Sequence, residues 1–224
     1  MAGRDGVFGE LAAAHYEDWY ETSEGQRADA LEKAALWRLL EGFAGARSIL
    51  EVGCGTGHFT RWLGDQGLAA VGLDVSAAML AQAQALNRAS LVRGDASRLP
   101  FADGAFDLTA LVTTLEFLEW PKDALAEAVR VGRRGVVLGL LNRRSALGLW
   151  RRLVALFRPT VYGMARFYSV REAKRLLRSV ADGRGRIEWR STLFPRWWPW
   201  PRADLPWGGF VAMALLLPGD GLTS

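Results

Sequence analysis

The residues best suited to chemistry in this chain lie in the segment Ile49-Leu50-Glu51-Val52-Gly53-Cys54-Gly55-Thr56-Gly57-His58. An aliphatic run ends in an acidic residue, three glycines alternate, and a segment with helical apolar spacing follows. This order predicts a strand, a tight turn and a helix. Glycine permits positive φ and lets a ligand approach the bare backbone. The next helix points its unpaired N–H groups at whatever the turn holds, so the segment predicts a ligand-binding loop.

The spacing of the glycines argues against a dinucleotide. The dinucleotide fingerprint G-x-G-x-x-G places its third glycine three residues after the second. Here the third glycine is Gly57, and His58 occupies the position where the fingerprint needs glycine. A nicotinamide-dependent oxidoreductase is therefore the weaker interpretation of this loop.

The G-x-G-x-G string after an acidic residue resembles the cofactor loop of class I S-adenosylmethionine-dependent methyltransferases. The resemblance implies that Glu51 faces the cationic methionine end of the cofactor. It also implies that the loop contacts the cofactor through Gly53, Cys54, Gly55, Thr56 and Gly57. Cys54 is expected to be a small residue that fits the turn, with no nucleophilic role.

Three later motifs extend the resemblance, which is strongest over residues 45–141. Asp74, at the tip of the second predicted strand, would accept hydrogen bonds from two ribose hydroxyls, because a carboxylate offers two oxygens. Val75 follows it, and Met79 would pack on the adenine face. Asp95 and Ala96 would contact the adenine edge. Thr113, after the fourth strand, would pass beneath the cofactor at the switch point of the sheet.

Glu116 is the best-placed candidate for a general base, since it follows the fourth strand directly into the cleft. Many members of the family have histidine near this point, so glutamate departs from the pattern. His15 is a weaker candidate for a catalytic role, and Tyr16 and Tyr20 are weaker candidates for cofactor contacts, on an N-terminal helix that would lie over the cofactor. Methyl transfer requires no metal, and two histidines and one cysteine suggest no metal site.

The order of predicted elements indicates an α/β fold, because strands alternate with helices in parallel βαβ units. The predicted strands are 49–52, 69–73, 91–93, 106–112, 136–141, 187–192 and 210–217, and the predicted helices are 9–42, 57–66, 76–87, 121–130, 145–157 and 169–180. Residues 194–202 are too rich in proline for a helix or a central strand. The resemblance implies a Rossmann-like, seven-stranded sheet of order 3-2-1-4-5-7-6 with an antiparallel last strand.

Length and composition bound the organisation of the chain. Its 224 residues suit one domain with a full core, in which residues 1–44 form a helical lid and residues 142–182 a helical cover for the substrate. Asn142, Arg143, Tyr162 and Arg166 are the candidate acceptor contacts within that cover. A single cysteine, no long apolar run and no signal peptide favour a cytoplasmic location.

The charge is strongly polarised along the chain. Residues 1–129 carry a net charge of −9 and residues 130–224 a net charge of +13. The basic half suggests an acidic partner, namely an anionic substrate, a membrane surface or nucleic acid, although an arginine-rich composition is an equally good explanation. The basic helix 145–157 and the Trp-Pro loop offer peripheral contact with an anionic membrane.

The sequence therefore predicts a methyltransferase acting on a small acceptor, apolar or anionic. A transfer RNA or other nucleic-acid methyltransferase is one alternative, but neither an Asn/Asp-Pro-Pro-aromatic motif nor a Pro-Cys motif occurs. A non-catalytic module that binds S-adenosylmethionine is the other. The oligomeric state stays open.

Overall fold

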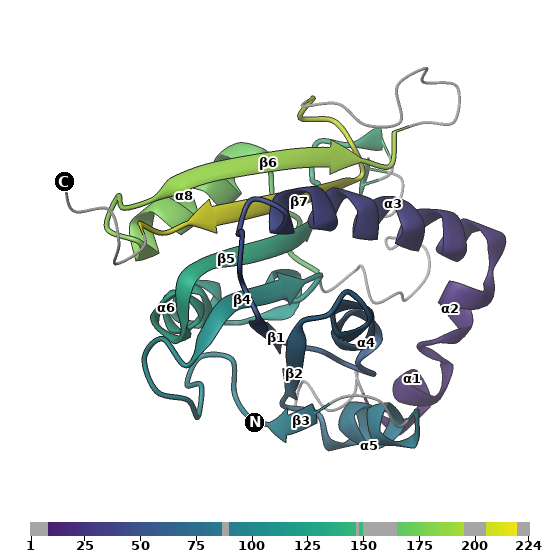
Figure 1. The fold of residues 1–224 in the computed structure, drawn as a ribbon. Coiled ribbons are helices and arrows are strands. Elements are labelled where there is room, and N and C mark those ends of the chain that lie inside the picture. Colours follow the sequence, from purple (N-terminus) through teal and green to yellow (C-terminus); the bar gives the residue numbers. More distant parts are fainter. Residues whose placement is uncertain (1–8, 87–89, 147, 150–164, 195–204, 219–224) are drawn as a thin grey trace.

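The computed structural model describes residues 9–86, 90–146, 148–149, 165–194 and 205–218. One seven-stranded sheet of order β3-β2-β1-β4-β5-β7-β6 runs through the molecule, as Figure 1 shows. The strands are β1 (Ser48–Val52), β2 (Ala69–Asp74), β3 (Ser90–Arg93), β4 (Phe106–Val112), β5 (Gly132–Leu141), β6 (Arg186–Thr192) and β7 (Phe210–Leu216). Five strands pair in parallel, and β7 lies antiparallel between β5 and β6. The predicted order and the antiparallel last strand are confirmed.

The central strands are nearly continuous apolar runs because helices cover both faces of the sheet. One face packs against α6 (Pro121–Val131) and α8 (Val170–Val180), through buried residues such as Leu125 and Leu177. The other face packs against α3 (Ser23–Leu40) and α4 (His58–Asp65), through buried residues such as Leu39 and Phe59. The helix α5 (Ala77–Ala85) lies beside β2 and β3.

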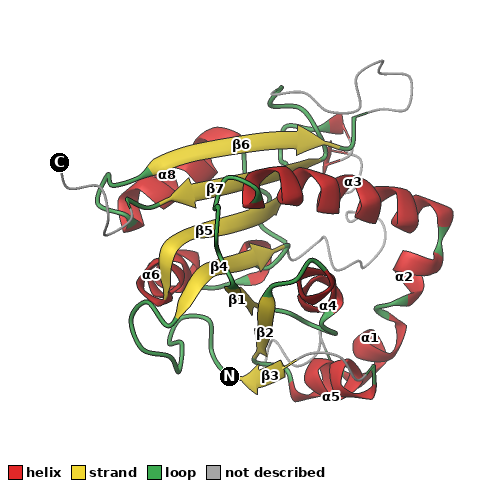
Figure 2. Ribbon diagram, in the orientation of Figure 1, coloured by secondary structure: helices red, strands yellow, loops and turns green. Residues whose placement is uncertain are grey.

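The N-terminal region differs from the single helix predicted over 9–42. It forms three helices, α1 (Glu10–His15), α2 (Asp18–Glu21) and α3, which Figure 2 shows in an arc along one side of the sheet. The break before α3 is at Thr22, which has extended backbone and accepts a hydrogen bond from Gly25 N–H. A threonine side chain satisfies a free N–H group at a helix start, so it favours a new N-terminus over continuation.

In the second half of the chain, side chains cap the predicted helix starts at 145 and 169. Ser169 and Glu172 form a capping box at the start of α8, as the Ser-x-x-Glu spacing predicts. The Ser145 hydroxyl accepts from Gly148 N–H, as expected for the cap of the predicted helix 145–157. Most of that helix and the Trp-Pro loop lie outside the described residues. No helix in the described segments is long and apolar enough to cross a membrane.

The amino edge of the sheet is held together by Asp107, at the start of β4. Its Oδ2 accepts from the N–H groups of Arg47 at 2.8 Å and Ser48 at 3.1 Å, and its Oδ1 accepts from Arg133 Nη2 at 2.6 Å. Burial alone would raise the pKa of Asp107, but these hydrogen bonds lower it to about 2. The carboxylate therefore fastens β1 to β4 on the side away from the glycine loop.

Candidate active site

The glycine loop joins β1 to α4 and can be built only from glycine at its first position. Gly53, Gly55 and Gly57 have φ of 76°, 54° and 77°. A Cβ atom on Gly53 would lie 2.2 Å from Thr114 Cγ2, whereas one on Gly55 would meet no atom within 4 Å. Gly53 therefore packs closely against the residue that follows β4, and there is open space beside Gly55.

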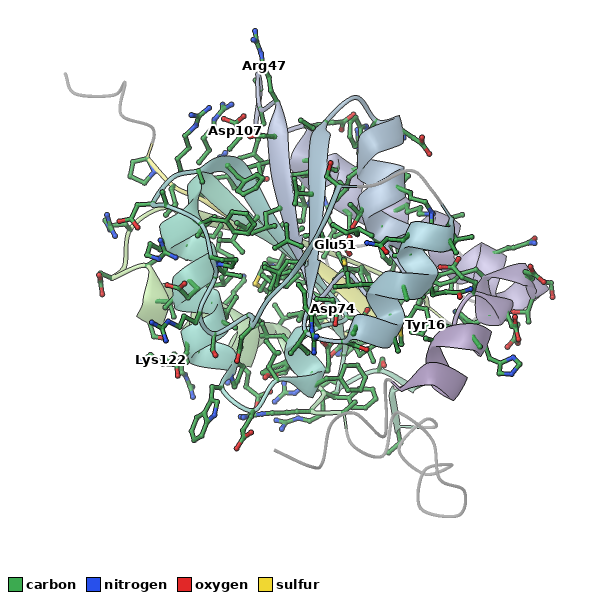
Figure 3. All side chains as sticks on the ribbon, turned by 90° about the horizontal axis from the view of Figure 1, so that it is seen from below. Tyr16, Arg47, Glu51, Asp74, Asp107 and Lys122 are labelled. Atoms are coloured by element: carbon green, nitrogen blue, oxygen red, sulfur yellow. The ribbon has the colours of Figure 1, made fainter. Side chains whose placement is uncertain are left out.

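Asp74, the last residue of β2, is anchored at this loop. Its Oδ2 accepts from Gly55 N–H and its Oδ1 from Ser76 N–H, both at 2.8 Å. Ser76 in turn caps α5 through Met79 N–H. Each carboxylate oxygen keeps a further lone pair, because it accepts only one of these bonds. Figure 3 shows Asp74 near Glu51 and far from Arg47 and Asp107, which lie toward the opposite end of the strands.

Glu51 lies beneath the loop and is 2% exposed. Its Oε2 accepts a short hydrogen bond from the Thr60 hydroxyl on α4. Burial raises its pKa to about 8, with the charge of Asp74 acting in the same direction. A buried carboxyl with one neutral partner is poised to ionise when a cationic group arrives beside it.

The remaining predicted cofactor residues lie around the loop in different environments. Val75 is 60% exposed, whereas Met79 is buried in the first turn of α5. Asp95 accepts from Ser97 N–H and is exposed, next to the buried Ala96. Thr113 has φ of 50°, a strained value for a β-branched residue, directly after β4.

The N-terminal helices are tied to the loop by residues that sequence reasoning missed. The Thr56 hydroxyl donates to Glu17, and Arg61 Nη2 lies 3.2 Å from the same carboxylate. Burial alone would raise the pKa of Glu17, but hydrogen bonds from His58 and Thr56 lower it to about 2. No local pattern marks Glu17, because its partners are about 40 residues away along the chain.

His58 is the centre of the same attachment. Its Nε2 lies 2.7 Å from Asp29 Oδ1, and the Tyr20 ring stacks on it at 3.7 Å. Burial would lower the pKa of His58, but the hydrogen bonds to Asp29 and Glu17 raise it. Tyr20 therefore contacts the residue that follows the loop, and the ring centroid of Tyr16 lies 6.2 Å from that of Tyr20. His15 is exposed instead and pairs with Asp18 at 2.9 Å.

Glu116 lies in the short helix η1 (Leu115–Phe117) directly after β4 and is 2% exposed. Its Oε1 accepts from Leu141 N–H at 2.6 Å, at the end of β5. Its Oε2 is buried and has no hydrogen-bond partner among the described residues. Burial raises its pKa to about 8. A buried, half-satisfied carboxyl is costly to keep and is therefore a functional candidate.

The predicted acceptor contacts after β5 are mostly engaged with the fold. Asn142 is fully buried, and its Nδ2 donates to the carbonyls of Pro206 and Gly208 at 2.8 Å. Arg143 pairs with Glu172 at 2.9 Å, and Arg166 lies over the Tyr168 ring. Tyr162 lies outside the described residues. The geometry makes Asn142 a support for the loop at 206–208, since its amide has no exposed face.

Cys54 and the acidic residues form no metal site in the part of the chain that the structure describes, where no group of three His, Cys, Asp or Glu side chains gathers. Burial raises the pKa of the Cys54 thiol, so it stays protonated.

Comparison with known proteins agrees with this geometry. The model of the methyltransferase domain family matches residues 50–140, from β1 to β5. A solved structure from Thermotoga maritima, described as an S-adenosylmethionine-dependent methyltransferase and possible histamine N-methyltransferase, superposes with a TM-score of 0.79. That protein is 27% identical, and the match covers 93% of this chain and 97% of the other.

Two curated relatives are similar over shorter segments. An uncharacterised protein of Mycobacterium tuberculosis is 36% identical over 180 residues, which are 79% of this chain and 58% of the relative. The demethylmenaquinone methyltransferase of Renibacterium salmoninarum is 36% identical over 104 residues, 44% of each chain. The matched segments span about three fifths of the first curated relatives' own length. Residues 50–140 form a methyltransferase domain, and the fold as a whole is similar to that of S-adenosylmethionine-dependent methyltransferases.

Proposed function

We propose that the chain transfers a methyl group from S-adenosylmethionine to a small-molecule acceptor, and that Glu116 accepts a proton from that acceptor. The observation that carries the proposal is the buried Oε2 of Glu116 at the end of β4, which has no hydrogen-bond partner in the described segments. Thr114, two residues before it, donates to Gly53 O of the glycine loop at 3.2 Å. The candidate base and the cofactor loop are therefore neighbours in one rigid corner of the sheet.

The residues at the loop fit the cofactor in shape and in charge. Gly55 has open space where a side chain would be, so a ligand can reach the backbone there. Asp74 has lone pairs for the ribose hydroxyls, and buried Glu51 is suited to the cationic methionine end. Asp95, Ala96, Val75 and Met79 would surround the adenine.

The bound cofactor supplies a methyl group already activated on a sulfonium, so the protein needs chiefly to align the acceptor and exclude water. In the proposal, residues 1–44 exclude water as a lid. Glu17 and Tyr20 hold that lid on the loop, through Thr56, Arg61 and His58. Residues 142–182 would cover the acceptor.

Glu116 would remove a proton from the acceptor while the acceptor's nucleophilic atom forms its bond to the methyl group. A carboxyl of ordinary pKa is too weak a base for a phenol or an ammonium, whereas one with a pKa of about 8 is better matched. Leu141 N–H holds Oε1, so in the ionised form of Glu116, which predominates above about pH 8, Oε2 is the oxygen that takes the proton. The demethylmenaquinone methyltransferase relative is consistent with an apolar small acceptor for this chain.

The experiment has two stages that separate binding from turnover. Calorimetry with S-adenosylmethionine and S-adenosylhomocysteine should show that both bind, and an acceptor panel of quinols, phenols, amines and carboxylates should reveal turnover. Transfer RNA serves as the competing acceptor. Methylation of RNA alone would contradict the small-molecule assignment, and binding without turnover on every acceptor would favour a non-catalytic module.

A further inference from the structure

A cationic groove runs along α8, outside the cofactor loop. It has a volume of about 500 Å³ and is lined by Arg144, Ser169, Val170, Arg171, Lys174, Arg175, Arg178 and Pro206. Five of these eight residues are basic and none is acidic. We propose that this groove binds a phosphate ester, and that it thereby anchors the phosphate-bearing part of the methyl acceptor.

The position of the basic residues on α8 makes one continuous stripe. Arg171, Lys174, Arg175 and Arg178 stand at i, i+3, i+4 and i+7, which share one face of a helix. The opposite face, with Ala173 and Leu177, is buried in the core. Like charges at these spacings destabilise a helix. Such a stripe is therefore unfavourable unless an anion neutralises it.

The stripe differs from the arginines that pair with carboxylates. Arg61 pairs with Glu17, Arg130 with Glu127, Arg133 with Asp107, Arg143 with Glu172 and Arg186 with Glu188. In the groove, no salt bridge joins Arg144, Arg171, Arg175 or Arg178 to an acid of the described residues. The one acidic residue of α8, Glu172, is already held by Arg143 and by its capping box.

The chemistry of the lining favours phosphate over a single carboxylate. Guanidinium groups bind phosphate through two parallel N–H donors, and several of them together suit a group with more than one negative charge. Lys174, whose ammonium lies 5.1 Å from the Trp189 ring, adds a fifth positive charge. The volume lies within the range of small-ligand pockets.

The segment that leads into the groove lies next to the residue proposed as the base. Arg144 follows Asn142 at the end of β5, and Asn142 pairs with Tyr168 just before the cap of α8. Leu141, one residue earlier, donates to the Glu116 carboxyl, and Arg166 N–H donates to Glu116 O. The segment that leads into the groove is therefore hydrogen-bonded to the residue proposed as the base.

Only the assignment of the phosphate to the methyl acceptor rests on the proposed function. Binding in the groove can be measured without turnover, so a failure of Glu116 as base leaves it intact. The two double variants to compare are Arg171→Gln/Arg175→Gln in the groove and Arg47→Gln/Arg186→Gln at the amino edge of the sheet. Both pairs remove two exposed positive charges, and thermal unfolding checks that each folds.

The probe is inorganic pyrophosphate, titrated into the full chain by calorimetry at low and at moderate salt. We expect the wild-type protein to bind it, the groove variant to bind at least tenfold more weakly, and the amino-edge variant to match the wild type. Added salt should weaken wild-type binding. Equal affinities in the two variants, or no binding by the wild type, would overturn the proposal.

Vesicles identify the source of the phosphate. Sedimentation with phosphatidylglycerol vesicles that pyrophosphate displaces would assign the groove to a lipid headgroup, and pyrophosphate binding without vesicle binding would assign it to a soluble ester. Transfer RNA that binds while pyrophosphate does not would overturn the proposal in favour of nucleic acid.

Discussion

Buried carboxyl groups at the two ends of the central strands have pKa values shifted in opposite directions. At the amino edge, Asp107 receives two backbone N–H groups and an arginine, and its pKa is lowered to about 2. At the carboxyl edge, Glu51 and Glu116 are buried with few donors, and the pKa of each is raised to about 8. Figure 3 shows Asp107 and Glu51 toward these different ends of the strands.

The difference distinguishes a carboxylate that stabilises the fold from carboxyl groups that are available to bind a ligand or a proton. A buried carboxylate with all its hydrogen bonds stabilises the structure that supplies them, whereas a buried carboxyl without them costs free energy. The rest of the fold offsets this free-energy cost. Buried carboxyl groups with perturbed pKa values cluster at sites that bind ligands or transfer protons. Four experiments test this difference between the two ends of the strands.

The largest effect is expected for Glu116→Gln. Removing a general base lowers kcat by roughly 10²- to 10⁴-fold, and the glutamine keeps the size of the side chain and its bond to Leu141 N–H. Steady-state kinetics with the acceptor found in the panel would measure the loss. Affinity for S-adenosylhomocysteine should stay within about twofold, as the control. A variant with wild-type kcat would remove Glu116 from the chemistry.

Asp107→Ala should act on stability and leave cofactor binding unchanged. The change strands the N–H groups of Arg47 and Ser48, and it should lower the free energy of unfolding by roughly 3 kcal/mol. Urea denaturation at neutral pH measures it. Arg133→Gln is the matched control, because it removes one partner and leaves the backbone bonds. An equal loss in both variants would show that the ion pair, and not the backbone bonding, holds this edge.

Asp74→Ala should weaken cofactor binding, with the lost ribose hydrogen bonds costing roughly 1–3 kcal/mol. Calorimetry with S-adenosylhomocysteine would show it as a higher Kd. Asp74 also accepts from Gly55 N–H and Ser76 N–H, so the alanine variant changes the loop as well. Asp74→Asn is the control, because it keeps the side-chain volume and one acceptor oxygen. Unchanged affinity in the alanine variant would contradict the ribose role of Asp74.

The pH dependence of stability should differ in sign at the two ends of the strands. Glu51 and Glu116 have folded-state pKa values raised above the usual 4.5, so the folded state binds more protons than the unfolded state between about 4.5 and 8. Unfolding free energy should therefore fall as pH rises through that window, by at most about 1.4 kcal/mol per pH unit for each group.

Asp107 works the other way, because its folded-state pKa is lowered from 3.8 to about 2. The stability it contributes is present above about pH 4 and is lost as pH falls toward about 2. Urea titrations from about pH 3 to about pH 9 on the wild type, Glu51→Gln and Glu116→Gln would test both signs. A decline between about pH 5 and 8 that neither glutamine variant reduces would locate the effect elsewhere.

Local sequence patterns predicted the structure correctly where it depends on hydrogen bonds between residues that are close along the chain. The glycine spacing, the Ser76 cap and the Ser169–Glu172 capping box predict their elements because each depends on bonds within a few residues. They failed at Thr22, where a single side chain begins a new helix inside an apolar-periodic segment. They also placed Asn142 among the acceptor contacts, although its amide is committed to carbonyls more than 60 residues away.

The α/β order and the glycine loop were predictable from the sequence, because they follow from backbone conformation and short-range bonding. Which acids are paired and which are left without partners depends on contacts between distant segments of the chain. Asp107, Glu51 and Glu116 are chemically alike in the sequence. Their pKa values diverge because burial and donors come from distant strands and helices.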